Sequence, residues 1–181
     1  VSVTTSDDDT AAFTLSGTAV TVSEAGSTAT FTVVLGAQPS SDVALSVVSA
    51  DTGEATVAPA TLTFTSGNWN AAQTVTATGV DDNATDGNQT TAVTVAVVDA
   101  SSDNAFDALA DQTVTATTSD DDSPGVSVSE SDGSTGTTES GGTDTFTVVL
   151  NTQPSSDVVV SVASSDTGEV TVAPATVTFT S

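Results

Sequence analysis

The chain has 181 residues, 24 of them acidic, and no Lys, Arg, His or Cys, so its formal net charge is −24. Without cysteine it can form neither a disulfide framework nor thiolate metal sites. Without basic side chains it lacks the residues that contact nucleic-acid phosphates or anionic membrane surfaces. Because 36% of its residues are hydrophobic, it differs from a disordered acidic tail and can bury a core.

The first eight residues, beginning VSVTT, have the pattern of a strand rather than of a signal peptide. From residue 9 onward, apolar residues alternate with threonine or serine at the period of two that is typical of half-buried strands. The alternating apolar positions are Phe31, Val33 and Leu35; Val43, Leu45 and Val47; Leu62 and Phe64; Val93, Val95 and Val97; and Val114 and Ala116. Turn sequences such as GAQPSSD, SADTGE and VDDNATDGN separate these runs. About seven short strands in roughly 110 residues predict an all-β fold, an antiparallel β-sandwich of immunoglobulin-like type.

The same unit occurs more than once along the chain. The segment FTVVLGAQPSSDV…TFTS at residues 31–66 returns as FTVVLNTQPSSDV…TFTS at residues 146–181, an offset of 146 − 31 = 115 residues. The hexapeptide TTSDDD occurs at residues 4–9 and again at 117–122. Such internal similarity indicates one structural unit used in tandem. We therefore predict that residues 1–8 are the last strand of a preceding repeat. Residues 9–122 form a complete sandwich, and residues 123–181 are the N-terminal half of the next repeat.

Acidic residues concentrate in the turns and strand ends of the complete repeat. Alternate connections of a sandwich meet at one end, so these carboxylates can surround a cation. Ca²⁺ takes about 6–8 oxygen ligands, whereas Mg²⁺ demands stricter octahedral geometry, and zinc, copper and iron prefer imidazole or thiolate ligands. Asp42 and Glu54 are interpreted instead as solvated charges that protect edge strands. The predicted carboxylate ligands of calcium are Glu24, Asp51, Asp81, Asp82, Asp86, Asp120, Asp121 and Asp122.

Three motifs carry a resemblance to a known family. VSEAGSTATFTVVL, the loop VDDNATDGNQT and the closing SDDD resemble a Calx-beta domain, over the complete repeat and both partial ones. The resemblance implies calcium binding by the carboxylates named above and by the backbone carbonyl of Ala84. Gln89 departs from the family pattern, because a second acidic ligand often stands there. The pattern QPSSDV…SDTGE…TFTS is also similar to tandem repeats of large bacterial adhesins that are exported by type I secretion.

Two motifs of the sequence also occur in proteins of other functional classes. Asp-Thr-Gly at residues 51–53 and 166–168 matches the motif of aspartic peptidases, but the two copies belong to different repeats and follow polar turns. With no His, Cys, Lys or Tyr available as base, nucleophile or acid, we predict that the protein is not an enzyme. Trp69 could stack on a sugar in a carbohydrate-binding module, but covering one end of the core is the favoured interpretation.

The predicted function is mechanical: a calcium-stiffened extender, or stalk, of a large secreted or cell-surface adhesin. The alternative is a repeat unit of a self-assembling extracellular filament. The expected partners are neighbouring repeats of the same chain, or other copies in a filament, with neither nucleic acid nor direct membrane insertion. Residues 119–124 leave almost no linker between repeats, whereas a flexible tether would be longer and richer in Gly and Ser. Tandem repeats with calcium bound are therefore expected to form a rod.

Overall fold

The structure is a computed structural model, and it describes residues 1–4 and 8–181. It divides into a first unit of residues 1–82 and 87–120 and a second unit of residues 83–86 and 121–181. The strand predicted at residues 1–8 falls partly on residues 5–7, which lie outside the described residues, and residues 1–4 form no strand. Within the described residues, no helix is long and apolar enough to cross a membrane.

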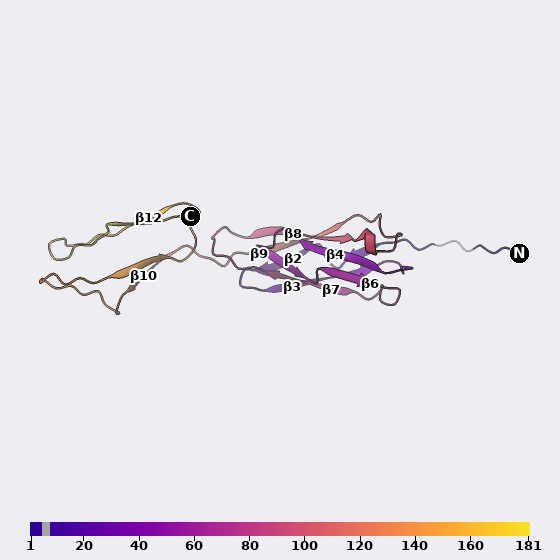
Figure 1. Cartoon of the computed structure of the whole chain (residues 1–181), viewed down its shortest axis with the longest axis horizontal. Helices are drawn as coiled ribbons and strands as arrows, with labels where there is room; N and C mark the ends of the chain where they lie inside the picture. The colour runs from indigo at the N-terminus through magenta and orange to yellow at the C-terminus, as the bar shows by residue number, and fades with distance from the viewer. Residues whose placement is uncertain (5–7) are drawn as a thin grey trace. The chain divides into compact units, whose positions relative to one another are not determined.

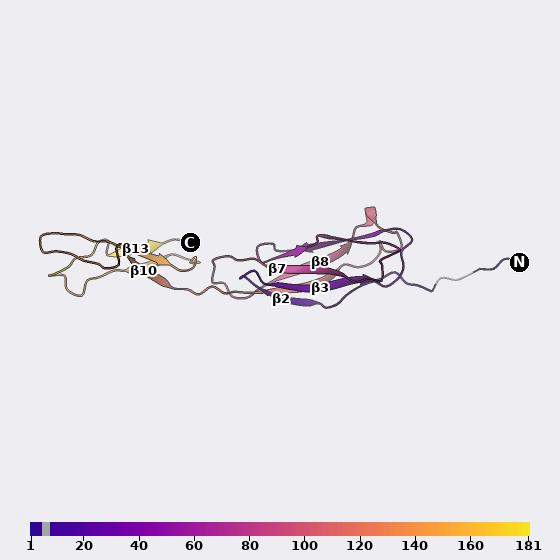
Figure 2. The same ribbon diagram turned by 90° about the horizontal axis from the view of Figure 1, so that it is seen from below.

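The first unit is an all-β sandwich of two sheets, with strands that run along its long direction (Figures 1 and 2). One sheet has the order β1-β3-β7-β5 and the other the order β2-β9-β8-β4-β6. The strands are β1 (Phe13–Leu15), β2 (Ala19–Ser23), β3 (Thr28–Leu35), β4 (Val43–Ser49), β5 (Ala55–Ala58), β6 (Thr61–Phe64), β7 (Gln73–Gly79), β8 (Gln89–Val97) and β9 (Gln112–Ser119). The prediction of an immunoglobulin-like β-sandwich is confirmed.

Two features of the sandwich are absent from the sequence pattern. The short strands β1 and β5 raise the number of strands from the expected seven or so to nine among the described residues of this unit. Strand β2 pairs in parallel with β9, from Ala19 opposite Thr115 to Ser23 opposite Ser119, whereas all other strand pairs are antiparallel within the described residues. The chain thus enters the first sheet with β1 and crosses to the second sheet with β2, which brings the ends of β2 and β9 together.

The core lies between the two sheets and consists mainly of valine, phenylalanine and alanine. In β3, the apolar side chains of Phe31, Val33 and Leu35 are 0–3% exposed while the intervening residues are half-buried. This is what a period-two pattern produces when one face of a strand packs on a core. Trp69 is half-buried and packs against this core, and its carbonyl accepts a hydrogen bond from the Leu35 backbone N–H at 3.1 Å. Its placement agrees with a structural role.

The second unit repeats the start of this arrangement. Its strands are β10 (Val126–Glu130), β11 (Phe146–Leu150), β12 (Val158–Ser161) and β13 (Thr176–Phe179). Val126 pairs with Leu150, as Phe13 pairs with Leu35 in the first unit, and Val158 pairs with Phe179, as Val43 pairs with Phe64. The register is therefore conserved between the two repeats. The core positions of the second unit are only half-buried, because the described residues include no counterparts of β7, β8 and β9 there.

Asp103 is a buried acidic residue of the first unit and links two loops through hydrogen bonds. Asp103 is 8% exposed, and its Oδ2 accepts hydrogen bonds from the Ser40 backbone N–H at 2.6 Å, the Ser40 hydroxyl at 2.7 Å and the Ser41 N–H at 3.1 Å. Its Oδ1 accepts a hydrogen bond from the Ala105 N–H at 3.0 Å. These bonds, with that of Ala105 the largest contribution, lower the pKa of Asp103 from 3.8 to about 2.

Asp103→Asn is expected to lower the stability of the first unit at neutral pH. Because the pKa of Asp103 is lower in the native state, its carboxylate stabilises that state at pH values above the unfolded-state pKa of 3.8. This stabilisation is lost as the pH falls toward about 2. The difference in the free energy of unfolding between the variant and wild type should therefore become smaller as the pH falls from 4 to 2. Urea denaturation followed by Trp69 fluorescence measures it, and Asp111→Asn, at an exposed position, is the control. If this difference in the free energy of unfolding stayed constant across the pH range, the ionised Asp103 carboxylate would not be the source of the stabilisation.

Candidate metal centre

Several strand ends of the first unit meet at one end of the sandwich. Strands β2 and β9 end side by side at Ser23 and Ser119, and β7 ends at Gly79, opposite Ala55 at the start of β5. Gly79 also lies against the backbone of Ser23, because a methyl group added there would overlap the Ser23 carbonyl oxygen. The residues that follow or precede these ends are acidic, so the fold concentrates carboxylates here.

The first acidic group consists of Glu24, Asp120 and Asp122, which each offer one carboxylate oxygen, all within 4.8 Å of one another. Glu24 is 1% exposed, and its backbone N–H donates to the Ser119 carbonyl at 3.2 Å. The Oδ2 of Asp120 accepts a hydrogen bond from the Gly87 N–H at 2.8 Å. The ends of the paired strands β2 and β9 thus place two of these carboxylates, and the chain supplies the third two residues later.

The second acidic group consists of Glu54, Asp82 and Asp86, again with one oxygen each within 4.8 Å. The Glu54 carbonyl accepts hydrogen bonds from the Val80 N–H at 2.9 Å and from the Thr118 hydroxyl at 3.1 Å. These bonds tie the residue that precedes β5 to the segments that follow β7 and end β9. Glu54 is half-buried, which differs from its interpretation as a solvated charge on an edge strand.

Of the nine residues predicted to bind calcium, five occur in these groups: Glu24, Asp82, Asp86, Asp120 and Asp122. Asp51, Asp81 and Asp121 are exposed and outside both groups. Asp51 caps its own turn, since its Oδ1 accepts from the Gly53 N–H at 2.9 Å. Ala84 is half-buried and forms an isolated parallel bridge with Gln153. The one signal for Glu54 in the sequence is the recurrence of Asp-Thr-Gly-Glu at residues 51–54 and 166–169.

The geometry of both groups fits a calcium ion. Ca²⁺ lies about 2.3–2.6 Å from its oxygen ligands, so two ligands of one ion are at most about 5 Å apart. The 4.8 Å limit within each group meets this condition, and the sequence offers no imidazole or thiolate that would favour zinc or copper. Three carboxylates are fewer than the ligands calcium takes, so backbone carbonyls and water would complete the coordination shell.

The Asp-Thr-Gly motifs form local turns rather than a pair of facing carboxylates in one unit. Asp166 accepts a hydrogen bond from the Gly168 N–H at 2.9 Å, as Asp51 does from Gly53. Each aspartate belongs to a different unit. Both side chains thus have a structural role in their own turns.

Comparisons with known proteins assign no family to this chain. No protein-family model matches the chain, and no curated protein matches it. Among solved structures, it is similar to SSP-19, an MSP-domain protein like family member in Caenorhabditis elegans, with 22% identity over 59% of this chain and 96% of that one and a TM-score of 0.39. It is also similar to the ASH/PapD-like domain of human CEP192, with 11% identity, 68% and 94% coverage and a TM-score of 0.46. Both TM-scores are below 0.5, so these similarities bear on neither the family nor the function of the chain.

Proposed function

We propose that this chain is a calcium-stiffened extender repeat of a large secreted or cell-surface adhesin. The observation that carries the proposal is the pair of carboxylate triads, in a sequence that contains no basic side chain. In each triad the carboxylates are close enough to share a cation, and only oxygen ligands are available.

Electrostatics explains why such triads need a cation. Two unit charges about 4 Å apart repel by about 1 kcal/mol in water and by about 4 kcal/mol at the effective dielectric constant of a protein surface. A protein domain is stable by only about 5–15 kcal/mol in total. A doubly charged ion in each triad would replace repulsion with attraction, and it would join segments from different strands. Calcium would supply here a structural cross-link and no chemistry.

The repetitive sequence supports a role in spacing. The two repeats share sequence and strand register, and repetition of one unit extends a molecule without adding a new binding surface. Asp120 and Asp122 stand where one repeat of the sequence gives way to the next. An ion held by these residues and by Glu24 would restrict the backbone torsions of the linking segment.

Small-angle scattering of a chain of several such repeats tests the proposal. With calcium, the distance distribution is expected to be that of an extended rod, and chelation should give a broader, coil-like distribution. Magnesium at the same ionic strength is the control, because it fits these sites less well while screening surface charge equally. A distribution that is coil-like in all three conditions would refute the proposed stiffening.

A further inference from the structure

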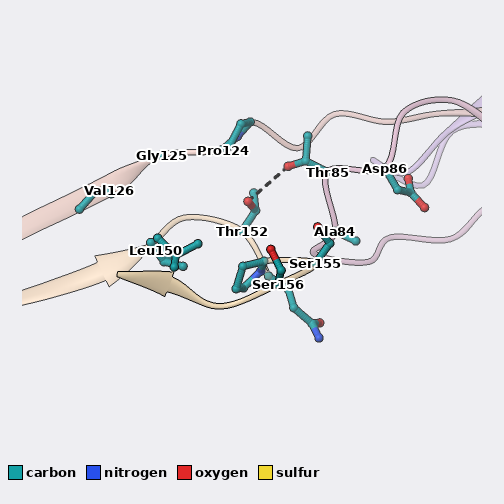
Figure 3. Close-up of a pocket in the computed structure, with 13 residues that line it drawn as sticks. Ala84, Thr85, Asp86, Pro124, Gly125, Val126, Leu150, Thr152, Ser155 and Ser156 are labelled. Carbon is teal, nitrogen blue, oxygen red and sulfur yellow. Dashed lines mark hydrogen bonds between the residues drawn. The ribbon is translucent and has the colours of Figure 1, made fainter. Parts of the chain in front are cut away.

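Residues 83–86 make a specific backbone contact within the second unit. The Asn83 carbonyl accepts a hydrogen bond from the Gln153 backbone N–H at 2.7 Å, and Ala84 forms an isolated parallel bridge with Gln153. The hydroxyl oxygens of Thr85 and Thr152 are 3.3 Å apart (Figure 3). Residues 83–85 therefore pair with the segment that follows β11, chiefly through the main chain.

The first unit contains the repeat counterpart of Gln153. The sequence QPSSDV stands at residues 38–43 and at residues 153–158. Just before it, the Gly36 N–H donates to the Ala12 carbonyl at 2.8 Å, as the Asn151 N–H donates to the Gly125 carbonyl at 2.9 Å. Because the strand register and these hydrogen bonds match, the backbone that presents the Gln153 N–H recurs at Gln38.

At Gln38 the corresponding hydrogen bond is missing. Its side-chain Nε2 donates to the Ser66 carbonyl at 2.8 Å, but its backbone N–H has no hydrogen-bond partner among residues 1–4 and 8–181. The residue is exposed, which leaves room for another chain segment beside it. The Gln38 N–H thus lacks a hydrogen bond that the equivalent Gln153 N–H of the other repeat makes.

We propose that the backbone at Gln38 is a docking site for the loop of another repeat with the chemistry of Asp82–Asp86. The contact would be one N–H to carbonyl bond in a short parallel pairing, which tolerates side-chain variation because the main chain forms it. The Thr85–Thr152 contact has no counterpart, since Ala37 stands at the position of Thr152 and is buried. The inference rests on the tandem array proposed above, but it does not depend on calcium.

Amide hydrogen exchange of the 181-residue chain tests whether the Gln153 N–H is hydrogen-bonded while the Gln38 N–H is not. The Gln153 amide is expected to exchange at least about tenfold more slowly than the Gln38 amide, since a hydrogen-bonded N–H must open before it exchanges. Each glutamine precedes Pro-Ser-Ser-Asp, so the two amides are matched within one molecule. Equal rates measured by ¹⁵N NMR would overturn the inference.

A longer chain tests the docking site itself. A further copy of residues 10–122 is inserted between Asp9 and Thr10, and only the residues that follow the insert are isotopically labelled. The labelled Gln38 amide is then expected to become as protected as Gln153. Replacing Asn83, Ala84 and Thr85 of the inserted copy with glycine should remove this protection. A labelled Gln38 amide that still exchanges fast in the unsubstituted longer chain would overturn the proposal.

The same samples separate this inference from the proposed function. If Gln38 gains protection while calcium does not alter the scattering, the docking site stands and the calcium stiffening fails. If calcium stiffens the array while Gln38 stays unprotected, the function stands and the docking site fails.

Discussion

Chelation of calcium is expected to lower the melting temperature of the first unit by about 10–20 °C. An ion that binds the native state alone adds about 4 kcal/mol when its free concentration is about a thousandfold above Kd, and each kcal/mol shifts Tm by a few degrees in a domain of this size. The double variant Asp82→Asn with Asp122→Asn removes one carboxylate from each acidic group. It should abolish most of this calcium shift. A thermal melt followed by Trp69 fluorescence, with and without calcium, measures it.

A neighbouring aspartate provides the matched control. Asp81 is adjacent to Asp82 in the sequence, but it is exposed and outside both acidic groups. Asp81→Asn should therefore keep the wild-type calcium shift, although it changes the net charge as Asp82→Asn does. In the calcium-free melt, the double variant should be as stable as wild type or more stable, because each group has one like charge fewer. If the double variant retained the full shift, these carboxylates would be solvated charges only.

Phe64→Ala is expected to destabilise the first unit by about 3–5 kcal/mol, the usual cost of truncating a buried phenylalanine. Its side chain is 0% exposed in the core between the two sheets. That cost is a large part of the stability of an ordinary domain, so the urea midpoint should fall sharply. Trp69, the only tryptophan of the chain, packs on the same core, and its fluorescence reports the unfolding of this unit.

Phe179 is the repeat counterpart of Phe64, since each ends a strand that pairs with the corresponding valine, Val158 or Val43. It lies in the second unit, where its side chain is only half-buried. Phe179→Ala should therefore leave the free energy of unfolding of the first unit, measured by Trp69 fluorescence, within about 0.5 kcal/mol of wild type. A large change of that free energy by Phe179→Ala would mean that the two units do not unfold independently.

The fold class follows from local chemistry and could be predicted from the sequence. Valine and threonine are β-branched and favour extended backbone. The spacing of Phe31, Val33 and Leu35 at every second position specifies which face of β3 packs on the core. The repeat was also evident from the sequence, because FTVVL recurs in β3 and β11, and the register of β1 with β3 recurs in β10 with β11. The restriction to oxygen ligands is a matter of composition alone.

Strand pairing, by contrast, depends on residues far apart in the sequence. The parallel pairing of β2 with β9 joins Ser23 to Ser119, and no local pattern marks it. Strand β1 has only three residues, and β5, with the sequence ATVA, has only one large apolar side chain, Val57, so neither gives a clear period-two signal. The link made by Asp103 is of the same kind, since its partners Ser40 and Ser41 are more than sixty residues away in the chain.

Composition and turn signals showed that acidic residues gather at the ends of strands, but they did not show which carboxylates share a site. The pairing of Ala55 with Gly79 brings Glu54 to Asp82 and Asp86, whereas Asp51, three residues earlier, caps its own turn. Asp82 joins a group, whereas its chain neighbour Asp81 is exposed and outside it. The sequence by itself determined the β-sandwich, its tandem repetition and the oxygen-only chemistry. The tertiary structure decided the membership of each acidic group, because a cation site requires side chains within a few ångströms, and only the register between distant strands determines that distance.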